Sequence, residues 1–222
     1  MRASPALARA WHAATIAIIA ASMIAQLVLV VRGVGTLVDQ AGGTAPLAVR
    51  LLRFFSYFTI QSNLLALGTA ATLIANSQRD GRTWRVVRIA AIVGMTVTFA
   101  VYMVLLRPIV HLEGIAKLCD IGFHYIAPVL TVLGWLLFGP WPRIDTRSLL
   151  RHLAWPVAYL LYILALGALS GWYPYPFLNA ALMGYPRAIG NCLVIAAVLL
   201  VIGAVYHLLD AKLGGAKAQP LD

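Results

Sequence analysis

Six long apolar runs constrain the fold of this chain more than any other feature. Hydrophobic residues make up 62% of its 222 residues and charged residues only 11%, against roughly 25% charged residues in an ordinary soluble domain. So much apolar surface cannot be buried inside one small globule, and the sequence therefore excludes a soluble protein. Since a membrane-spanning helix takes about 20 apolar residues, we expect six spans, at residues 9–31, 54–76, 86–106, 121–138, 152–170 and 188–208.

These runs predict an all-α, polytopic membrane protein built as a six-helix bundle. No run shows the strict alternation of a barrel strand. The first run is longer than the apolar core of a cleaved signal peptide, so we interpret it as a span. We expect a single domain over residues 1–212 and a flexible tail over residues 213–222, which are mostly small and polar.

Lysine and arginine residues are distributed unevenly between the two sides of these spans. The two termini and the second and fourth loops hold 11 of them, and the opposite side holds 6. Because cytoplasmic loops carry the excess of positive charge, we expect both termini in the cytoplasm, in a bacterial inner membrane. The net charge of +10 then serves to anchor the spans at lipid headgroups, and we expect no nucleic-acid partner.

The sequence offers little for a metal or a disulfide. Its two cysteines, Cys119 and Cys192, are too few for a disulfide scaffold or a cysteine-rich metal site, and we expect buried free thiols. No HExxH motif is present, and every carboxylate falls in a loop, at a span end or in the tail. This pattern disfavours a zinc hydrolase, a di-iron site and a carboxylate proton relay. We expect no cofactor, with a haem bound by His124 and another span as the alternative left open.

The second span is unusually polar near its start. Ser56, Thr59 and Asn63 are spaced i, i+3 and i+7, which places them on one face of a helix, with Ser62 beside them. Such residues often hydrogen-bond neighbouring helices, and this is the plain structural interpretation. The functional interpretation makes Thr59 a nucleophile, with Asn63 or Gln61 as the orienting or oxyanion-binding donor.

The fourth span carries a histidine one turn before a proline. Pro128 removes the hydrogen bond to the carbonyl of His124 and loosens that turn. A neutral His124 within reach of Thr59 can act as a general base, whereas a structural histidine would bond to a neighbouring helix. No clear carboxylate is available to orient the imidazole. Asp120, four residues earlier on the same face, is a weak candidate beside a backbone carbonyl, a tyrosine or an asparagine.

Further polar residues gather in the predicted outer half of the bundle. Tyr102 and Asn191 fall there, which suggests a pocket that opens to the outer leaflet, while the inner half is mainly aliphatic. The proline- and aromatic-rich loop at residues 170–179 can form an interfacial aromatic belt or a lid over that pocket. Outer basic residues can bind a substrate carboxylate or simply lipid headgroups, and the candidates are Arg50, Arg53 and Arg107.

Three short motifs resemble one family. They are Tyr57-Phe58-Thr59-x-x-Ser62-Asn63, His124-x-x-x-Pro128 and Tyr173-Pro174-Tyr175-Pro176-Phe177-Leu178-Asn179.

The chain resembles the bacterial six-span branch of the family of androgen-induced gene one and androgen-dependent TFPI-regulating protein, and the resemblance extends over nearly the whole span pattern. The eukaryotic members are intramembrane threonine hydrolases that cleave fatty acid esters of hydroxy fatty acids. The resemblance implies that Thr59 is the nucleophile and His124 the base.

Residues and resemblance together predict a lipid-ester hydrolase in the bilayer. His124 would take the proton of Thr59, an acyl-threonine would form, and water would release the acid. Ser62, Asn63, Gln61, Asn191 and Tyr102 would bind the substrate or its oxyanion. The rival classes are a small transporter, which needs a polar path to both sides, and a non-catalytic lipid-binding protein, in which Thr59 and His124 need not touch.

Overall fold

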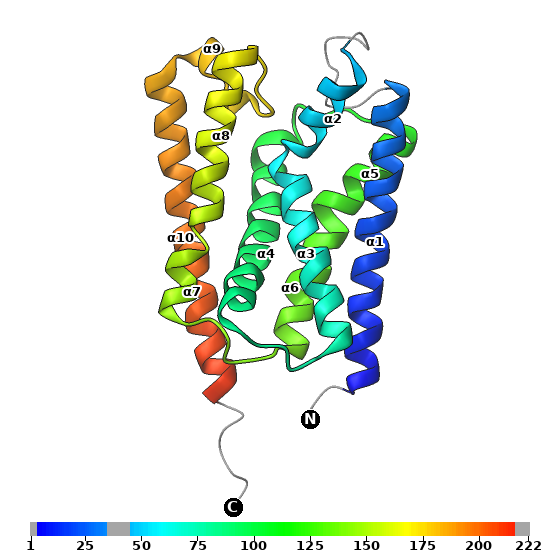
Figure 1. Cartoon of the computed structure of the whole chain (residues 1–222), viewed down its shortest axis with the longest axis vertical. Coiled ribbons are helices and arrows are strands. Elements are labelled where there is room, and N and C mark those ends of the chain that lie inside the picture. Colours follow the sequence, from blue (N-terminus) through cyan, green and yellow to red (C-terminus); the bar gives the residue numbers. More distant parts are fainter. Residues whose placement is uncertain (1–3, 35–44, 216–222) are drawn as a thin grey trace, which may run out of the picture. The chain divides into compact units, whose positions relative to one another are not determined.

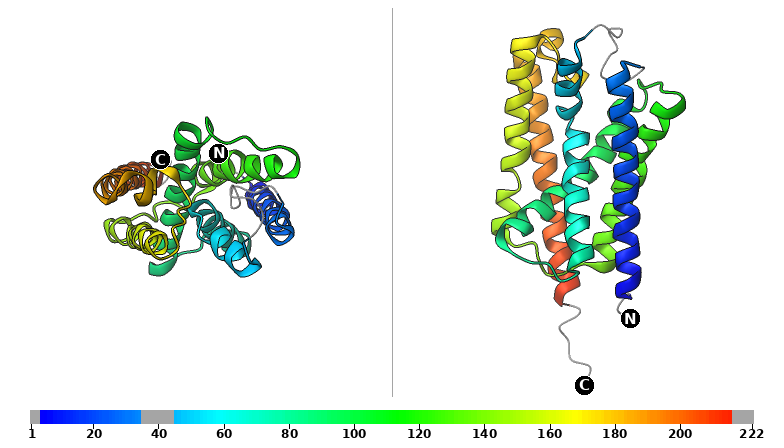
Figure 2. Two further views of the ribbon diagram at one scale, coloured as in Figure 1. Left: turned by 90° about the horizontal axis from the view of Figure 1, so that it is seen from above. Right: turned by 45° about the vertical axis from the view of Figure 1, so that its right-hand side comes forward.

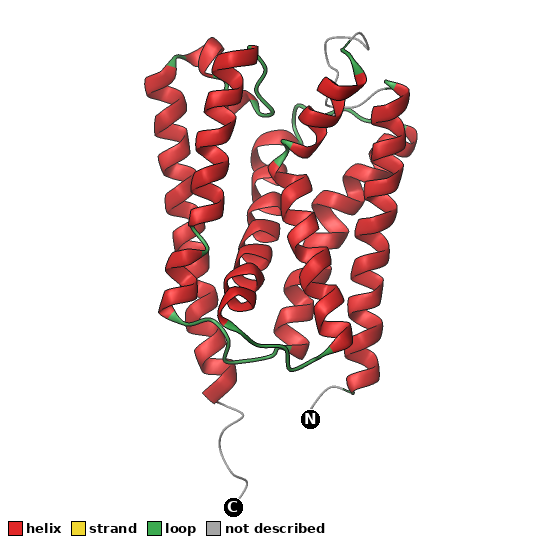
Figure 3. Ribbon diagram, in the orientation of Figure 1, coloured by secondary structure: helices red, strands yellow, loops and turns green. Residues whose placement is uncertain are grey.

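The structure is a computed structural model that describes residues 4–34 and 45–215. Every regular element within these residues is a helix, and they contain no strand (Figure 3). Six helices are long and apolar enough to cross a membrane, namely Pro5–Arg32, Phe58–Ala75, Arg82–Leu106, Gly114–Phe138, Thr146–Ser170 and Tyr185–Gly215. The prediction of an all-α, multi-pass membrane protein with six spans is therefore confirmed at this level.

The helix ends differ from the predicted span ends. Five of the six helices are longer than the apolar runs that predicted them, because polar residues at a helix end lower the hydropathy without ending the helix. The last helix continues to Gly215, so the first three residues of the expected tail are helical. The rest of that tail, residues 216–222, lies outside the described part of the chain.

The contacts divide the chain into two compact units. The first is formed by Met1–Asp80 and Gly94–Pro140, and the second by Gly81–Val93 and Trp141–Asp222. Helix α4 (Arg82–Val101) therefore contributes to both. The expectation of one six-helix domain stays a prediction.

The first unit is assembled around the long helix α1 (Pro5–Arg32). It packs along α3 (Phe58–Ala75) and against α2 (Leu47–Phe55), α5 (Gly114–Ile121) and α6 (Ala127–Phe138). Figure 1 and the two views of Figure 2 show this arrangement.

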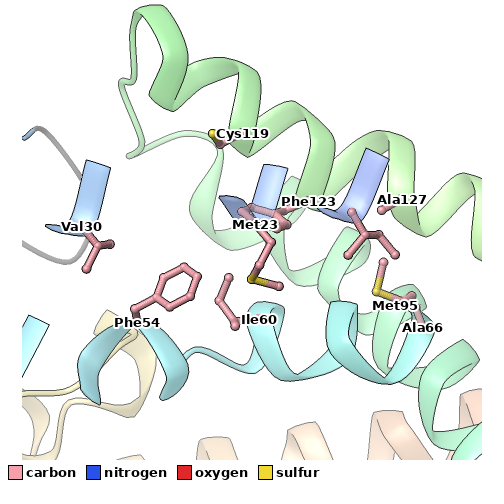
Figure 4. Close-up of a cluster of buried hydrophobic side chains, with 10 residues drawn as sticks. Met23, Val30, Phe54, Ile60, Ala66, Met95, Cys119, Phe123 and Ala127 are labelled. Carbon is pink, nitrogen blue, oxygen red and sulfur yellow. The ribbon is translucent and has the colours of Figure 1, made fainter. Parts of the chain in front are cut away.

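A continuous apolar cluster fills the space between these helices. The side chains of Phe54 and Ile60 point toward Met23 of α1 in Figure 4. The buried members of the cluster are Ile19, Met23, Val30, Phe54, Ile60, Ala66, Met95, Cys119, Phe123 and Ala127. Since lipid tails are as apolar as these side chains, close packing rather than water exclusion holds such helices together.

Helix α1 also holds the fourth span at two points. A side chain at Gly122 would collide with that of Ser22, so only a glycine allows the two backbones to approach this closely. Further along, Trp11 Nε1 donates to the carbonyl of Leu130 over 2.8 Å. These contacts fix the position of the segment that carries His124.

The second unit contains the remaining helices. They are the start of α4, α7 (Thr146–Arg151), α8 (Ala154–Ser170), the 3-10 turn η4 (Pro176–Leu178), α9 (Ala180–Met183) and α10 (Tyr185–Gly215).

One carboxylate in this unit is fully buried. Asp210 lies near the end of α10. Its Oδ2 accepts hydrogen bonds from the backbone N–H groups of Arg143, at 2.6 Å, and Ile144, at 2.7 Å. Asp210 lies in the last turns of this helix, which continues to Gly215, beyond the apolar run that predicted it.

The aromatic loop after α8 is packed onto its own unit. Tyr173 occupies the space where Gly167 has no side chain. Tyr175 and Phe177 stack with ring centroids 5.2 Å apart, and Asn191 Nδ2 donates to the carbonyl of Phe177 over 2.8 Å. The belt and the lid interpretations of this loop both stay predictions. Cys119 and Cys192 are buried and free, as expected.

Candidate active site

A helix break places Thr59 at the start of its span. Helix α2 ends at Phe55, Tyr57 is extended, and α3 begins at Phe58. The Ser56 hydroxyl and its backbone N–H both donate to the carbonyl of Leu52, over 2.7 and 3.0 Å, so Ser56 completes the last turn of α2. The prediction that Ser56 shares a helix face with Thr59 is therefore wrong, and Thr59 is the second residue of α3.

Two π-helical turns carry Tyr102 and His124. The first, η2 (Tyr102–Leu106), closes α4, and its Arg107 N–H donates to the carbonyl of Tyr102 over 2.7 Å. The second, η3 (Gly122–Ile126), lies between α5 and α6 and includes His124. Single π turns inside α-helices occur often at functional sites. We expected Pro128 to loosen the helical turn at His124, and in the structure His124 lies in a π-helical turn.

Thr59 and His124 lie within hydrogen-bonding distance of each other. Thr59 Oγ1 is 3.1 Å from His124 Nε2, and both residues are buried. They are 65 positions apart in the chain, so the pairing is tertiary and comes from the packing of α3 against η3. A threonine nucleophile needs a general base within hydrogen-bonding distance of its hydroxyl. His124 lies at that distance.

Asp120 faces the other nitrogen of the same imidazole. His124 Nδ1 is 2.9 Å from Asp120 Oδ1 and 3.2 Å from the Asp120 backbone carbonyl oxygen. When the ring donates to that carbonyl through Nδ1, Nε2 presents its lone pair to Thr59. The hydrogen bond at Nδ1 goes to the backbone carbonyl, one of the orienting groups that the sequence allowed, and Asp120 Oδ1 lies close by without a hydrogen-bond partner among the described residues. The role of the Asp120 carboxylate in orienting the ring stays a prediction.

Tyr102 completes the surroundings of the carboxylate. Its hydroxyl donates to Asp120 Oδ2 over 2.5 Å. Its ring stacks on the His124 imidazole, with centroids 4.1 Å apart and an interplanar angle of 17°. We expected Tyr102 to bind substrate or oxyanion, but its hydroxyl hydrogen is committed to Asp120. The contribution of Tyr102 was not apparent from the sequence, because its contacts depend on how α4 packs.

The three polar residues after Thr59 have different surroundings. Asn63 Nδ2 donates to the carbonyl of Thr59 over 2.8 Å and lies 3.5 Å from that of Phe123, which links α3 to η3. Gln61 Nε2 donates to the carbonyl of Phe55 over 3.1 Å and so caps α2. Ser62 is fully buried, and its hydroxyl has no hydrogen-bond partner among the described residues.

The proposed carboxylate-binding residues lie at helix ends. Arg50 Nη1 donates to the carbonyl of Val30 over 2.8 Å and thereby caps α1. Arg53 is half-buried in the last turn of α2, and Arg107 is exposed directly after η2. Asn191 belongs to the second unit, where it holds the Phe177 carbonyl. A substrate role for these four residues stays a prediction.

The arrangement supplies the parts of a nucleophilic site. A hydroxyl faces an imidazole, a backbone carbonyl is hydrogen-bonded to the other ring nitrogen, and a carboxylate that a tyrosine holds lies 2.9 Å from that nitrogen. This is the order of groups that activates an alcohol for attack on an acyl carbon. In the described part of the chain, no three histidine, cysteine or acidic side chains are grouped as metal ligands would be.

Comparisons of the chain with protein families, with curated proteins and with solved structures find no match. The chemistry of the site therefore carries the functional argument.

Proposed function

We propose that this protein is an intramembrane hydrolase that cleaves lipid esters, with Thr59 as nucleophile and His124 as general base. The observation that carries the proposal is the 3.1 Å contact between Thr59 Oγ1 and His124 Nε2, in a pair whose Nδ1 faces Asp120. A purely structural contact between the two helices would need only one hydrogen bond. An imidazole oriented on both nitrogens is what general-base catalysis needs.

The reaction follows from these groups. Thr59 Oγ1 attacks the ester carbonyl carbon while its proton passes to His124 Nε2. The tetrahedral intermediate collapses, the proton moves from Nε2 to the departing alcohol, and an acyl-threonine remains. Water then attacks the acyl carbon, gives its proton to Nε2 and releases the acid, and Thr59 regains its proton. Asp120 holds the ring in position and stabilises the imidazolium that forms in each half-reaction.

The substrate class in this proposal comes from the setting and from the resemblance. Six helices long and apolar enough to cross a bilayer suit a substrate that is itself dissolved in lipid. The motifs around Thr59 and His124 resemble the androgen-induced gene one family, whose eukaryotic members cleave fatty acid esters of hydroxy fatty acids. We therefore propose these esters as substrates, a bacterial inner membrane as the location and the cytoplasm as the side of both termini.

The decisive experiment compares ester hydrolysis by four purified variants. Wild type and Thr59→Ser keep a hydroxyl at this position, whereas Thr59→Ala and His124→Ala each remove one reacting group. We expect wild type to hydrolyse long-chain esters, Thr59→Ser to retain part of that activity, and both alanine variants to lose it. Thr69→Val is the matched control, since Thr69 is a buried hydroxyl on α3 that bonds to the Ala66 carbonyl.

The same variants distinguish catalysis from passive lipid binding or transport. A fluorophosphonate probe should label wild type at Thr59 and leave Thr59→Ala unlabelled. Full activity in Thr59→Ala, or a wild type that hydrolyses no ester in the panel, would exclude the proposed mechanism.

A further inference from the structure

A second tyrosine contacts the ring of Tyr102. The centroid of the Tyr125 ring lies 5.5 Å from that of Tyr102, and the angle between the two ring planes is 74°. This edge-to-face geometry is one that aromatic pairs prefer. Tyr125 has no part in the proposed reaction, so its contact with Tyr102 needs an explanation of its own.

Tyr125 also contacts a second ring on the helix that carries Tyr102. The centroids of Phe99 and Tyr125 are 6.3 Å apart, and the rings are nearly perpendicular, at 89°. Phe99 and Tyr102 are three positions apart in the helix Arg82–Leu106 and therefore share one of its faces. Tyr125 thus packs against this face at two points.

The residue before Tyr125 contacts Tyr102 as well. His124 and Tyr125 are consecutive in η3. The His124 imidazole stacks on the Tyr102 ring at 4.1 Å and 17°, whereas Tyr125 meets that ring at 74°. A stacked pair can still slide along the plane of its rings, and a third ring that is steeply inclined to this plane restrains the sliding. Two consecutive residues of η3 therefore restrict different movements of Tyr102.

We infer that Tyr125 is a positioning residue, which acts on the reaction through Tyr102. The inference rests on the proposed ester hydrolysis. The Tyr125 ring keeps the Tyr102 ring on the imidazole, and it thereby keeps the Tyr102 hydroxyl at 2.5 Å from Asp120 Oδ2. The ring of Tyr125 does this rather than its hydroxyl, because both contacts that carry the inference are between rings.

The first test measures hydrolysis of a long-chain ester by wild type, Tyr125→Leu and Tyr125→Phe. Leucine removes the ring, and phenylalanine keeps it. We expect Tyr125→Leu to lose about threefold to tenfold in kcat, the range that the free energy of one aromatic pair allows, with KM close to that of wild type. Tyr125→Phe should restore the kcat of wild type.

The second test follows the NMR signal of the His124 Cε1 proton and needs no substrate. The ring current of a stacked tyrosine displaces this signal. Among the five histidines, His124 gives the signal that is absent from His124→Ala. We expect Tyr125→Leu to shift it toward its position in Tyr102→Leu, which lacks the stacked ring, and Tyr125→Phe to leave it in place. An unchanged signal in Tyr125→Leu would overturn the inference.

Phe138→Leu is the matched control for the loss of an aromatic ring in the first unit. Phe138 pairs with Trp11 at a centroid distance of 5.8 Å, and it lies 14 positions after His124, about 21 Å along the helix at 1.5 Å per residue. Its substitution should change neither kcat nor the His124 signal. Equal changes in Phe138→Leu and Tyr125→Leu would show a general loss of packing and would contradict the positioning role.

The effect of Tyr125 should also depend on the presence of the Tyr102 ring. In Tyr102→Leu no ring remains for Tyr125 to hold, so adding Tyr125→Leu should lower kcat no further. Multiplicative losses would show that Tyr125 acts independently of Tyr102, which overturns the inference. If Tyr125→Leu fails to fold, Tyr125→Met serves in its place, because the flexible methionine fills irregular gaps.

The two tests separate this inference from the proposed function. A wild type that hydrolyses no ester removes the function, and the NMR signal then still shows whether Tyr125 holds Tyr102 on His124. An active wild type that needs Thr59, together with a Tyr125→Leu variant of equal kcat and unchanged signal, would overturn the positioning role alone.

Discussion

The hydroxyl of Tyr102 donates a 2.5 Å hydrogen bond to one oxygen of Asp120, while the other oxygen of that carboxylate lies 2.9 Å from His124 Nδ1. The carboxylate is buried and is held between two side chains from different helices. A charged group is tolerated in such a place when its oxygens are hydrogen-bonded. The Tyr102 hydrogen bond thus stabilises the Asp120 carboxylate, and the backbone carbonyl of Asp120, 3.2 Å from His124 Nδ1, orients the imidazole.

Asp120→Asn should reduce turnover without dismantling the site. The amide keeps the shape of the carboxylate, but it lacks the charge that stabilises the imidazolium and can present an N–H to Nδ1. We expect kcat for ester hydrolysis to fall by about 10³-fold, with KM close to that of wild type. Steady-state kinetics on the detergent-solubilised protein measure this. A variant with wild-type kcat would show that the backbone carbonyl of Asp120 alone orients the ring.

Tyr102→Phe should have a smaller effect, because it acts through Asp120. The phenylalanine keeps the ring that stacks on His124 at 4.1 Å and removes the donor to the carboxylate. We expect kcat to fall by about tenfold, which corresponds to about 1.4 kcal/mol in the activation free energy. In the Asp120→Asn background the same substitution should cost much less, since the two residues act as one unit. Independent, multiplicative losses would contradict this coupling.

The close approach of α1 to the fourth span gives a prediction about packing. A methyl group at Gly122 would collide with the side chain of Ser22, whereas one at Gly68 on α3 would meet nothing within 4 Å. Gly122→Ala should therefore destabilise the protein by about 1–3 kcal/mol through overpacking, and Gly68→Ala should be neutral or slightly stabilising. Thermal unfolding in detergent measures both.

A second substitution, at Ser22, tests whether this collision causes the loss of stability. Ser22→Gly removes the group that blocks Gly122→Ala, so the double variant should recover most of the lost stability. If the double variant is no more stable than Gly122→Ala, the collision is not the cause.

The number of spans was predictable because hydropathy averages over a whole run, but the start of the fourth helix was not. Lys117 and Asp120 interrupt the apolar pattern, and the predicted span therefore began at residue 121 instead of Gly114. The carboxylate there is held by a hydrogen bond from Tyr102 and lies 2.9 Å from His124 Nδ1. Those partners come from tertiary contacts, which no local pattern contains.

The sequence identified the two reacting residues as candidates, but it could not show that they touch. Spacing and residue chemistry identified Thr59 and His124, yet their distance depends on the break at Ser56 and Tyr57 that sets where α3 begins. Ser56 was expected to continue the helix, but the chain is extended at Tyr57, which separates α2 from α3. The unpaired hydroxyl of Ser62 becomes visible only when its neighbours are known.

A final prediction concerns Asp145, the N-cap of α7, outside the spanning helices. Its Oδ1 accepts a 2.7 Å hydrogen bond from the N–H of Ser148, and its Oδ2 lies 3.0 Å from Arg85 Nη1. The Ser148 bond is the main reason that the pKa of this carboxyl lies below its ordinary value, and Arg85 adds to the effect. Asp145→Ala should therefore cost about 1 kcal/mol at pH 7, the usual value of an N-cap.

The pH dependence of this cap follows from the lowered pKa. The unfolded chain binds the proton more readily than the folded one, so the charge contributes stability above about pH 3.9, the ordinary aspartate value. That contribution is lost as the pH falls below this value through the folded pKa. Asp145→Asn keeps the capping oxygen without the charge, so wild type should unfold at a higher temperature than this variant at pH 7. The difference should be small, because the carboxylate side chain is 48% exposed and an exposed ion pair is screened. It should shrink as the pH falls below about 3.9, and a difference that stays unchanged at every lower pH would show that the charge plays no part.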